Sequence, residues 1–224
     1  MRAGSNVAAA GEGDLIARLE RRLFREPPFV TVPAALRDFV TGDHALGNDL
    51  PDISPVRPAA VLVPLVARRD GEGAGAYSML LTQRAAALRE HAAQVAFPGG
   101  KIDAADASPL AAALREAREE IGLPSSLVRP LGYLDGYLSA SGYSILPVVG
   151  LVDPAFTPVP DPGEVDEVFE VPLDFLMDVN HHERHAREWK GTLRHYYAMP
   201  YGKHYIWGAT AGIIRNLYER VYAE

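Results

Sequence analysis

The sequence contains no cysteine among its 224 residues. This absence excludes disulfide bonds, thiol nucleophiles and zinc sites built on cysteine. Long apolar runs are missing too: no stretch of about 18 apolar residues occurs, so we expect no membrane-spanning helix and no membrane partner. Residues 1–6 lack the apolar segment of a secretory signal. A cytoplasmic location is the expectation that fits these absences.

An excess of basic charge is also missing. The chain has 22 lysines and arginines against 29 aspartates and glutamates, which gives a net charge of −7. This balance argues against a nucleic-acid partner, because such proteins normally present a basic surface. An acidic protein can still bind a polyphosphate where metal ions and a few arginines neutralise the pocket locally. The apolar content of 48% and the length are typical of one soluble globular domain.

The apolar pattern of the remaining chain predicts a mixed sheet flanked by helices. Residues 59–67 form a near-continuous apolar run, which is typical of a buried strand. Residues 70–75 indicate a turn, and residues 77–82 are expected to return as the next strand. Further elements are expected at 128–137, 145–151, 165–171 and 192–199 as strands, at 172–177 as a helical turn, and at 207–222 as an amphipathic helix. This order predicts the α/β class.

The N-terminal quarter differs in composition. We expect residues 1–57 to form a helical and irregular extension, and residues 58–224 to form the folded domain. Residues 1–13 are small and polar, and are expected to be disordered. The proline-rich stretch at 27–58, with a short helix at 34–40, is expected to be an arm that wraps the domain or a partner. A semi-flexible linker is the alternative.

One helix is predicted inside this extension. Asp14 is expected to cap it. Its apolar stripe consists of Leu15, Ile16, Leu19 and Leu23. The stripe suggests a homodimer, although docking onto the chain's own core would give the same pattern.

A helix with well-defined ends is predicted at about residues 109–121. Ser108 is a favourable N-cap, and Pro109 occupies the first helical position. Gly122 supplies the residue after the helix, and Pro124 prevents its continuation. The apolar stripe is expected to consist of Leu110, Leu114, Ala117 and Ile121. Three glutamates fall in an arc on the other side: Glu116, Glu119 and Glu120.

The acidic arc predicts a divalent-metal site that faces a phosphate chain. Glu116 and Glu120 form a like-charge pair that destabilises an isolated helix by about 0.2–0.5 kcal/mol. Only Arg115, four residues before Glu119, offers local compensation. The Phe-Pro-Gly-Gly turn at residues 97–100 lies just upstream, and glycines let backbone approach a ligand closely. Carboxylate and carbonyl oxygens are the ligands that Mg²⁺ and Mn²⁺ prefer. A merely solvated acidic face is the alternative.

The segment from Gly100 to Leu123 resembles the Nudix box, G-x5-E-x7-R-E-U-x-E-E-x-G-U, where U is aliphatic. The core pattern R-E-x-x-E-E-x-G, which starts at Arg115, is intact. Two departures occur: Asp106 stands where the first glutamate is expected, and the gap from there to Arg115 is one residue longer. Ala117 is also a small occupant of the first aliphatic position.

The upstream segment resembles the signature of one Nudix branch, the coenzyme A pyrophosphatases. That signature reads L-L-T-x-R-x-x-x-L-R-x-H-x-G-Q-V-x-F-P-G-G, and it aligns with residues 80–100. The branch itself carries the aspartate and the longer gap. Ala93 replaces the glycine before Gln94, so the turn would be strained if that glycine needs a positive φ. The resemblance runs from about residue 58 to the C-terminus.

This resemblance implies a fold, a metal site and a reaction. The fold is an α/β/α sandwich with a mixed sheet. The metal is Mg²⁺ or Mn²⁺, and its ligands are the Gly100 carbonyl, Glu116, Glu119 and Glu120. Arg115 would pair with a helix carboxylate and hold its rotamer. The general base would be Glu116 or a loop residue, for which Glu164 is the first candidate and Glu167 the second; a solvated turn is the alternative for both.

The implied substrate is coenzyme A or an acyl or oxidised form, cleaved to 3′,5′-ADP and 4′-phosphopantetheine or its derivative. Arg84 and Arg89 are candidates for phosphate contacts through their forked donors. His91 and Gln94 are further substrate-binding candidates, unless they only orient the loop.

Two other functions stay open. The chain could act on another nucleoside diphosphate derivative, such as ADP-ribose, because the box serves the whole superfamily. It could also be a sensor that binds nucleotide without cleaving it, although such a module would be expected to lose metal carboxylates. A cluster of histidines at 181, 182 and 185 lacks the H-E-x-x-H spacing of a zinc helix and is interpreted as a polar turn.

Overall fold

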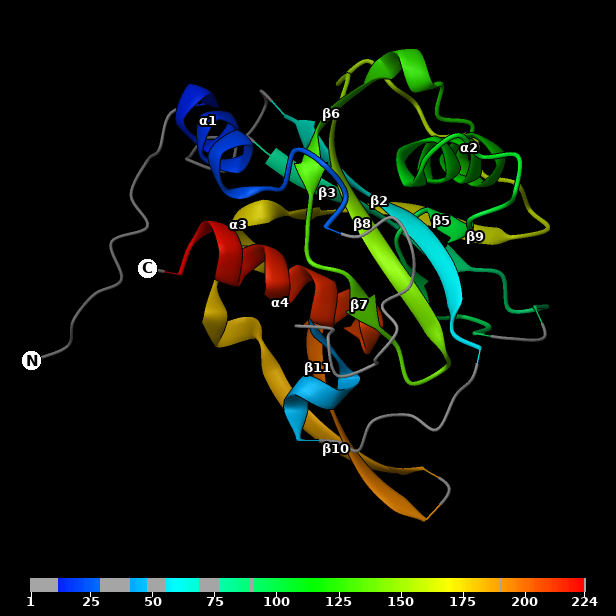
Figure 1. Ribbon diagram of the computed structural model, residues 1–224, viewed down its shortest axis with the longest axis vertical. Coiled ribbons are helices and arrows are strands. Elements are labelled where there is room, and N and C mark those ends of the chain that lie inside the picture. The colour runs from blue at the N-terminus through cyan, green and yellow to red at the C-terminus, as the bar shows by residue number, and fades with distance from the viewer. Residues whose placement is uncertain are drawn as a thin grey trace, which may run out of the picture.

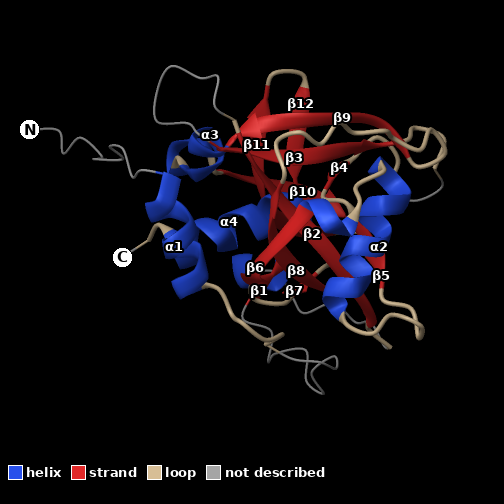
Figure 2. Cartoon of the chain, turned by 90° about the horizontal axis from the view of Figure 1, so that it is seen from above, coloured by secondary structure: helices blue, strands red, loops and turns tan. Residues whose placement is uncertain are grey.

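The structure is a computed structural model that describes residues 12–28, 41–47, 55–68, 77–88, 91–189 and 191–223. Within these residues the chain forms a mixed nine-stranded sheet and a separate three-stranded sheet. Helix α2 covers one face of the large sheet, and helices α1 and α4 lie on the other side (Figures 1 and 2). The predicted α/β class with a mixed sheet between helices is confirmed.

The large sheet is built around β2 (Arg57–Ala67), the buried strand predicted from its apolar run. It pairs in parallel with β8 (Tyr143–Val152) and antiparallel with β3 (Tyr77–Arg84) and β5 (Gly99–Lys101). The strands that complete the sheet are β1 (Thr41–Gly42), β4 (Val95–Ala96), β6 (Val128–Tyr133), β7 (Tyr137–Leu138) and β9 (Val165–Pro172). This order places β5, with its two glycines, beside the middle of the sheet.

The strand expected at 128–137 is in fact two strands, β6 and β7. Asp135 lies in the break, where its N–H donates to Asn216 Oδ1 at 3.3 Å. Its carboxylate also accepts from Asn216 and from Arg220, at 2.9 and 2.8 Å. Because these bonds run to helix α4 (Ala209–Val221), the backbone leaves the ladder at this point.

Helix α2 (Pro109–Ile121) has the predicted ends. The Ser108 side chain accepts from the Ala111 N–H, and Gly122 adopts a left-handed conformation with φ of 69°. The predicted faces need correction. Against the sheet the helix buries Ala112, Ala113, Ala117, Ile121 and Glu120, whereas Leu110 and Leu114 are only half-buried. Small alanine side chains let the helix approach the sheet closely, so the buried face is rotated toward the glutamates.

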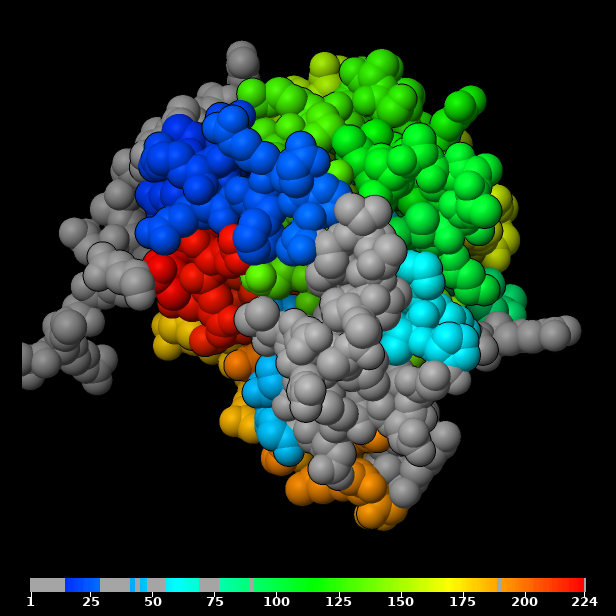
Figure 3. All heavy atoms as spheres, viewed as in Figure 1, coloured from blue at the N-terminus to red at the C-terminus, as the bar shows by residue number. Residues whose placement is uncertain are grey.

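Helix α1 (Glu12–Arg22) docks onto the chain's own core. Leu15, Leu19 and Leu23 belong to the same buried cluster as Leu217 of α4. Figure 3 shows α1, in blue, lying against α4, in red. The stripe that suggested a homodimer is therefore covered by this protomer, and the homodimer stays a prediction without that support.

Two expectations for the N-terminal region change. The helix begins at Glu12, so Asp14 lies inside it and is not its cap. The helix expected at 34–40 and most of the disordered start lie outside the described residues. The boundary at residue 57 remains a prediction, although α1 belongs to the packed core.

The C-terminal part forms the three-stranded sheet β10 (Glu183–Trp189), β11 (Thr192–Tyr201) and β12 (His204–Trp207). Only β11 was predicted. Helix α4 starts at Ala209, later than predicted, because Trp207 ends β12 and Gly208 turns the chain with φ of 63°. The short helices are α3 (Leu173–Met177) and three 3-10 turns at Asp43–Leu46, Ser125–Leu127 and Val179–His181.

The three histidines have separate partners. His181 Nδ1 and His182 Nε2 lie 2.9 and 2.7 Å from the carbonyl oxygens of Phe175 and Leu176. His185 contacts Glu183 instead. None of the described helices is long and apolar enough to cross a membrane.

Candidate active site

The glycine turn and helix α2 meet at two glycines, where an added Cβ would meet backbone at Gly99 and the end of the Glu116 side chain at Gly100. The Gly99 N–H donates to Glu120 Oε2 at 3.1 Å. A Cβ at Gly99 would lie 2.5 Å from the Ala60 carbonyl oxygen, and one at Gly100 would lie 2.5 Å from Glu116 Cδ. Pairing of β5 with β2 therefore holds the turn directly under two of the predicted carboxylates.

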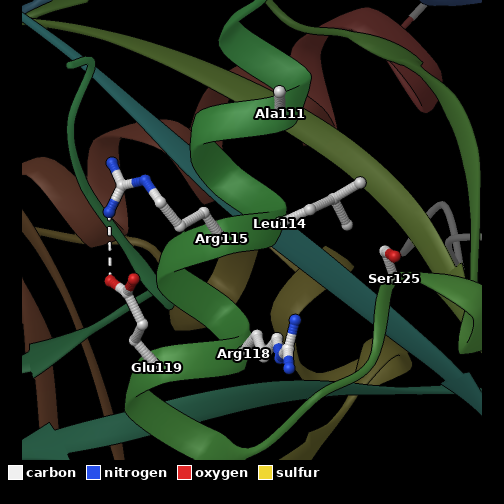
Figure 4. A pocket seen from close by; sticks show the side chains of 6 residues that line it. All are labelled: Ala111, Leu114, Arg115, Arg118, Glu119 and Ser125. Carbon is white, nitrogen blue, oxygen red and sulfur yellow. Dashed lines mark hydrogen bonds and ion pairs between the residues drawn. The ribbon is translucent and has the colours of Figure 1, made fainter. Parts of the chain in front are cut away.

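Arg115 connects the turn to the helix carboxylates. Its Nε and Nη2 each lie 3.0 Å from one oxygen of Asp106, and Nη2 also donates to the Lys101 carbonyl at 3.1 Å. Its Nη1 donates to Glu116 Oε1 and to Glu119 Oε2, both at 3.0 Å. Figure 4 shows the pair with Glu119 along the outer side of α2. One guanidinium thus fixes the rotamers of two candidate metal ligands.

Glu120 is the most buried of the candidate ligands, with 2% of its surface exposed. Burial raises its pKa to about 7, and the Gly99 hydrogen bond and Arg84 oppose that rise. Burial also raises the pKa of Glu116, against the effect of Arg115. The charge of Glu116 raises the pKa of Glu120 further, and the charge of Glu119 raises that of Glu116, because like charges resist ionising together. The site therefore favours a cation between these groups.

The donor chemistry fits a hard divalent ion, but the side chains do not converge. Among the described residues, no three His, Asp or Glu side chains gather into a ready metal-binding group. The reason is that Arg115 holds Glu116 and Glu119, whereas Glu120 turns inward to Gly99. Carboxylates on successive turns of α2 are hard oxygen donors of the kind that Mg²⁺ and Mn²⁺ take. Joint ligation would require these side chains to turn toward one ion, while Arg115 keeps one oxygen each of Glu116 and Glu119.

The substrate-side candidates lie at the end of β3 and in the turn at residues 91–94. Arg84 Nη1 lies 3.5 Å from Glu120 Oε1, and its buried Nε has no hydrogen-bond partner among the described residues. His91 Nδ1 lies 2.9 Å from Gln94 Oε1. Arg89 lies outside the described residues. Arg84 therefore reaches the carboxylate helix, whereas His91 and Gln94 contact each other.

The turn at residues 91–94 has an unusual backbone. His91 and Ala93 both have φ of 56°, in the left-handed region that favours glycine. The position before Gln94 thus needs a positive φ, and Ala93 adopts it at the expense of strain.

The two loop candidates for the general base differ. Glu164 is exposed, and its charge contributes to the raised pKa of both Glu116 and Glu120, so it lies on their side of the molecule. Glu167 instead pairs with Lys203 at 2.9 Å. The geometry favours Glu164 over Glu167 as the loop candidate.

Two features of this region were missed from the sequence. The sequence marks Asp106 only as a departure from the Nudix box, yet Asp106 is the main partner of Arg115. Its place at the first acidic position of the box could have indicated this role. An open hollow of about 590 Å³ also lies over the outer face of α2. It is lined by Ala111, Leu114, Arg115, Arg118, Glu119 and Ser125 (Figure 4). The hollow includes neither Glu116 nor Glu120, so it lies beside the carboxylate pair.

Known proteins resemble this chain over the region that carries the site. The model of the NUDIX domain family matches residues 56–192. The "Uncharacterized Nudix hydrolase NudL" of Cronobacter sakazakii is 44% identical over 169 residues, which cover 72% of this chain and 81% of that protein. The protein of the same name in Escherichia coli (strain K12) is 44% identical over 161 residues, with the same shares.

A solved structure gives a further match. It is the Nudix hydrolase RenU from M. smegmatis, with 25% identity and a TM-score of 0.42, over 55% of this chain and 74% of that one. The family match alone spans more than half of the present chain and contains β2, the glycine turn and α2. With that match and relatives at 44% identity, this chain belongs to the Nudix hydrolase family.

Proposed function

We propose that this Nudix hydrolase cleaves the pyrophosphate bond of coenzyme A or its derivatives in a metal-dependent reaction. The products would be 3′,5′-ADP and 4′-phosphopantetheine or its acyl form. One observation carries the proposal: Glu120 of the box helix is contacted by Gly99 and by Arg84. Both contacts come from the upstream segment whose pattern resembles the coenzyme A branch. The contact between the segment and the box supports a single site.

Arg84 is suited to bind a phosphate of this substrate. Its Nε is buried without a partner, and its only ion pair among the described residues is the long one to Glu120. An unpaired buried donor is costly, and a phosphate oxygen would satisfy it. His91 and Gln94 would contribute further polar contacts beside it.

The metal ligands would be the Gly100 carbonyl, Glu116, Glu119 and Glu120. When bound, Mg²⁺ or Mn²⁺ neutralises charge on the pyrophosphate and lowers the pKa of the attacking water. Arg115 would keep the carboxylates oriented, through its contacts to the helix and to Asp106.

In the reaction, water adds to one phosphorus atom and the bond from that phosphorus to the bridging oxygen breaks. The proton of the water would pass to Glu116, with Glu164 as the second candidate. Glu116 is suited to this step because its carboxyl lies against Gly100, where the attacking water would be held beside the ion. The bridging oxygen leaves with the other phosphate.

A substrate panel tests the proposal. Purified protein with Mg²⁺ or Mn²⁺ would be given coenzyme A, an acyl-coenzyme A, ADP-ribose and a dinucleotide, and kcat/KM compared. The proposal expects the highest value for a coenzyme A form, with 3′,5′-ADP as product. A higher value for ADP-ribose or a dinucleotide would assign another substrate class to the same site. Binding without turnover of any of them would point to a nucleotide sensor.

A further inference from the structure

Gln83 and Arg84 are neighbours at the end of β3, where the pairing with β9 shifts register, and their side chains contact different parts of the molecule. Arg84 reaches Glu120 on α2. Gln83 faces the other way, toward His204 on β12, with its Oε1 3.5 Å from His204 Nδ1. Residues 83 and 84 therefore link the contact with α2 to the contact with β12.

The turn at residues 91–94 needs support, because two of its non-glycine residues are left-handed. That conformation destabilises a non-glycine residue by roughly 1–2 kcal/mol, so contacts outside the turn must hold it. The Gln83 side-chain amide donates to the Ala93 carbonyl. The Arg84 N–H donates to the Gln94 carbonyl at 2.9 Å. The turn is therefore held from β3 at two successive carbonyls.

The other end of the Gln83 amide is fixed by a rigid partner. His204 is 9% exposed, and its ring stacks on Phe169 with centroids 3.6 Å apart and planes 3° from parallel. Its Nε2 lies 3.8 Å from Glu167 Oε1. A ring held in this way can keep the Gln83 amide in place beside the Ala93 carbonyl.

From these contacts we infer that Gln83 and His204 are positioning residues for the substrate turn. They act from the face of the sheet opposite to the carboxylates, by holding the Ala93 carbonyl and with it the placement of His91 and Gln94. The inference rests on the proposed function only in that the turn binds substrate. The α4 side of the sheet would thereby contribute to substrate affinity through the turn, in addition to Arg84 on the α2 side.

The test replaces Gln83 by Met, which keeps its length but removes the amide. Hydrogen exchange measured on the metal-free protein should become about fivefold faster at residues 91–96 and stay unchanged in α2. In the substrate assay, KM should rise about fivefold while kcat changes less than about twofold. His204→Phe keeps the stack and should give a smaller change, of about twofold. The double variant should equal Gln83→Met, because both act through one amide.

Tyr205→Phe is the matched control. Tyr205 follows His204 on β12 but contacts His185 on the other face, so exchange at residues 91–96 should match the wild type. Unchanged exchange in Gln83→Met, faster exchange throughout the chain, or additive effects in the double variant would overturn the inference. A wild-type protein that leaves coenzyme A intact would refute the proposed function alone. The exchange measurements would still decide the role of Gln83.

Discussion

Asp106 and Arg115 form a two-point ion pair in which Nε and Nη2 each lie 3.0 Å from a different carboxylate oxygen. The Asp103 N–H donates to the same carboxylate at 2.8 Å. The hydrogen bond from Arg115 lowers the pKa of Asp106 below its ordinary value of 3.8, although burial acts in the opposite direction. This pair joins the loop before α2 to the residue that also holds Glu116.

Asp106→Asn should destabilise the protein by about 1–3 kcal/mol at neutral pH, because a charge-assisted two-point contact is lost. A folded pKa below the unfolded one gives stability that is present above about pH 4 and is lost as pH falls through the folded pKa. The difference in the free energy of unfolding between wild type and variant should therefore become smaller in acid. Denaturant unfolding gives the measurement. Asp103→Asn, at a side chain 67% exposed and 3.6 Å from Arg115, is the control and should change little.

Ala93→Gly should stabilise the protein by about 0.5–1 kcal/mol. Glycine removes the left-handed strain of Ala93, which outweighs the entropy it adds to the unfolded chain. Ala96→Gly in β4 is the matched control and should destabilise, because glycine weakens an extended strand. Thermal unfolding of both variants gives the measurement. If Ala93→Gly lowered the midpoint as much as Ala96→Gly, Ala93 would not be strained.

Helix α2 shows how far the sequence alone can go. Its ends were predicted correctly because Ser108 and Gly122 act through local backbone geometry. Its buried face was predicted in part: Ala117 and Ile121 are buried as expected. Periodicity also favours Leu114 for the core, and it cannot foresee that a glycine N–H would hold Glu120 against the sheet. The helix caps could be predicted from the local sequence, whereas the close packing of Glu120 against the sheet could not.

The three-stranded sheet is a part of the fold that the sequence pattern predicts poorly. Strand β10 is mostly polar and charged, so it lacks the apolar alternation by which strands are predicted. The contact of Gln83 with His204 joins residues 121 positions apart, and nothing local marks it. Similarly, the pairing of Arg115 with Asp106 becomes visible only once β5 folds back under α2.

Glu120→Gln should stabilise the metal-free protein at high pH. The folded pKa of about 7 lies above the ordinary 4.5, so the contribution of Glu120 is full below pH 4.5 and is lost as pH rises through 7. Gln cannot ionise, so the free energy of unfolding of the variant should gain roughly 3 kcal/mol over that of wild type between pH 4 and pH 8. Denaturant unfolding in chelator gives the measurement. Glu119→Gln, at a side chain 55% exposed, is the control, and a gain at Glu120 independent of pH would contradict the prediction.

Gly100→Ala should leave the fold intact and reduce kcat by about 100-fold, for whichever panel substrate the wild type cleaves best. The atoms nearest the new Cβ would be the end of the Glu116 side chain, which can move aside at little expense to stability but then leaves its place in the site. Gly99→Ala is the contrast, because its Cβ would meet backbone of Ala60 and Val61 at 2.5 and 2.6 Å. That variant should unfold at markedly lower denaturant. Full activity in Gly100→Ala would remove Glu116 from the reaction, whereas equal destabilisation of both variants would show that the turn is only structural.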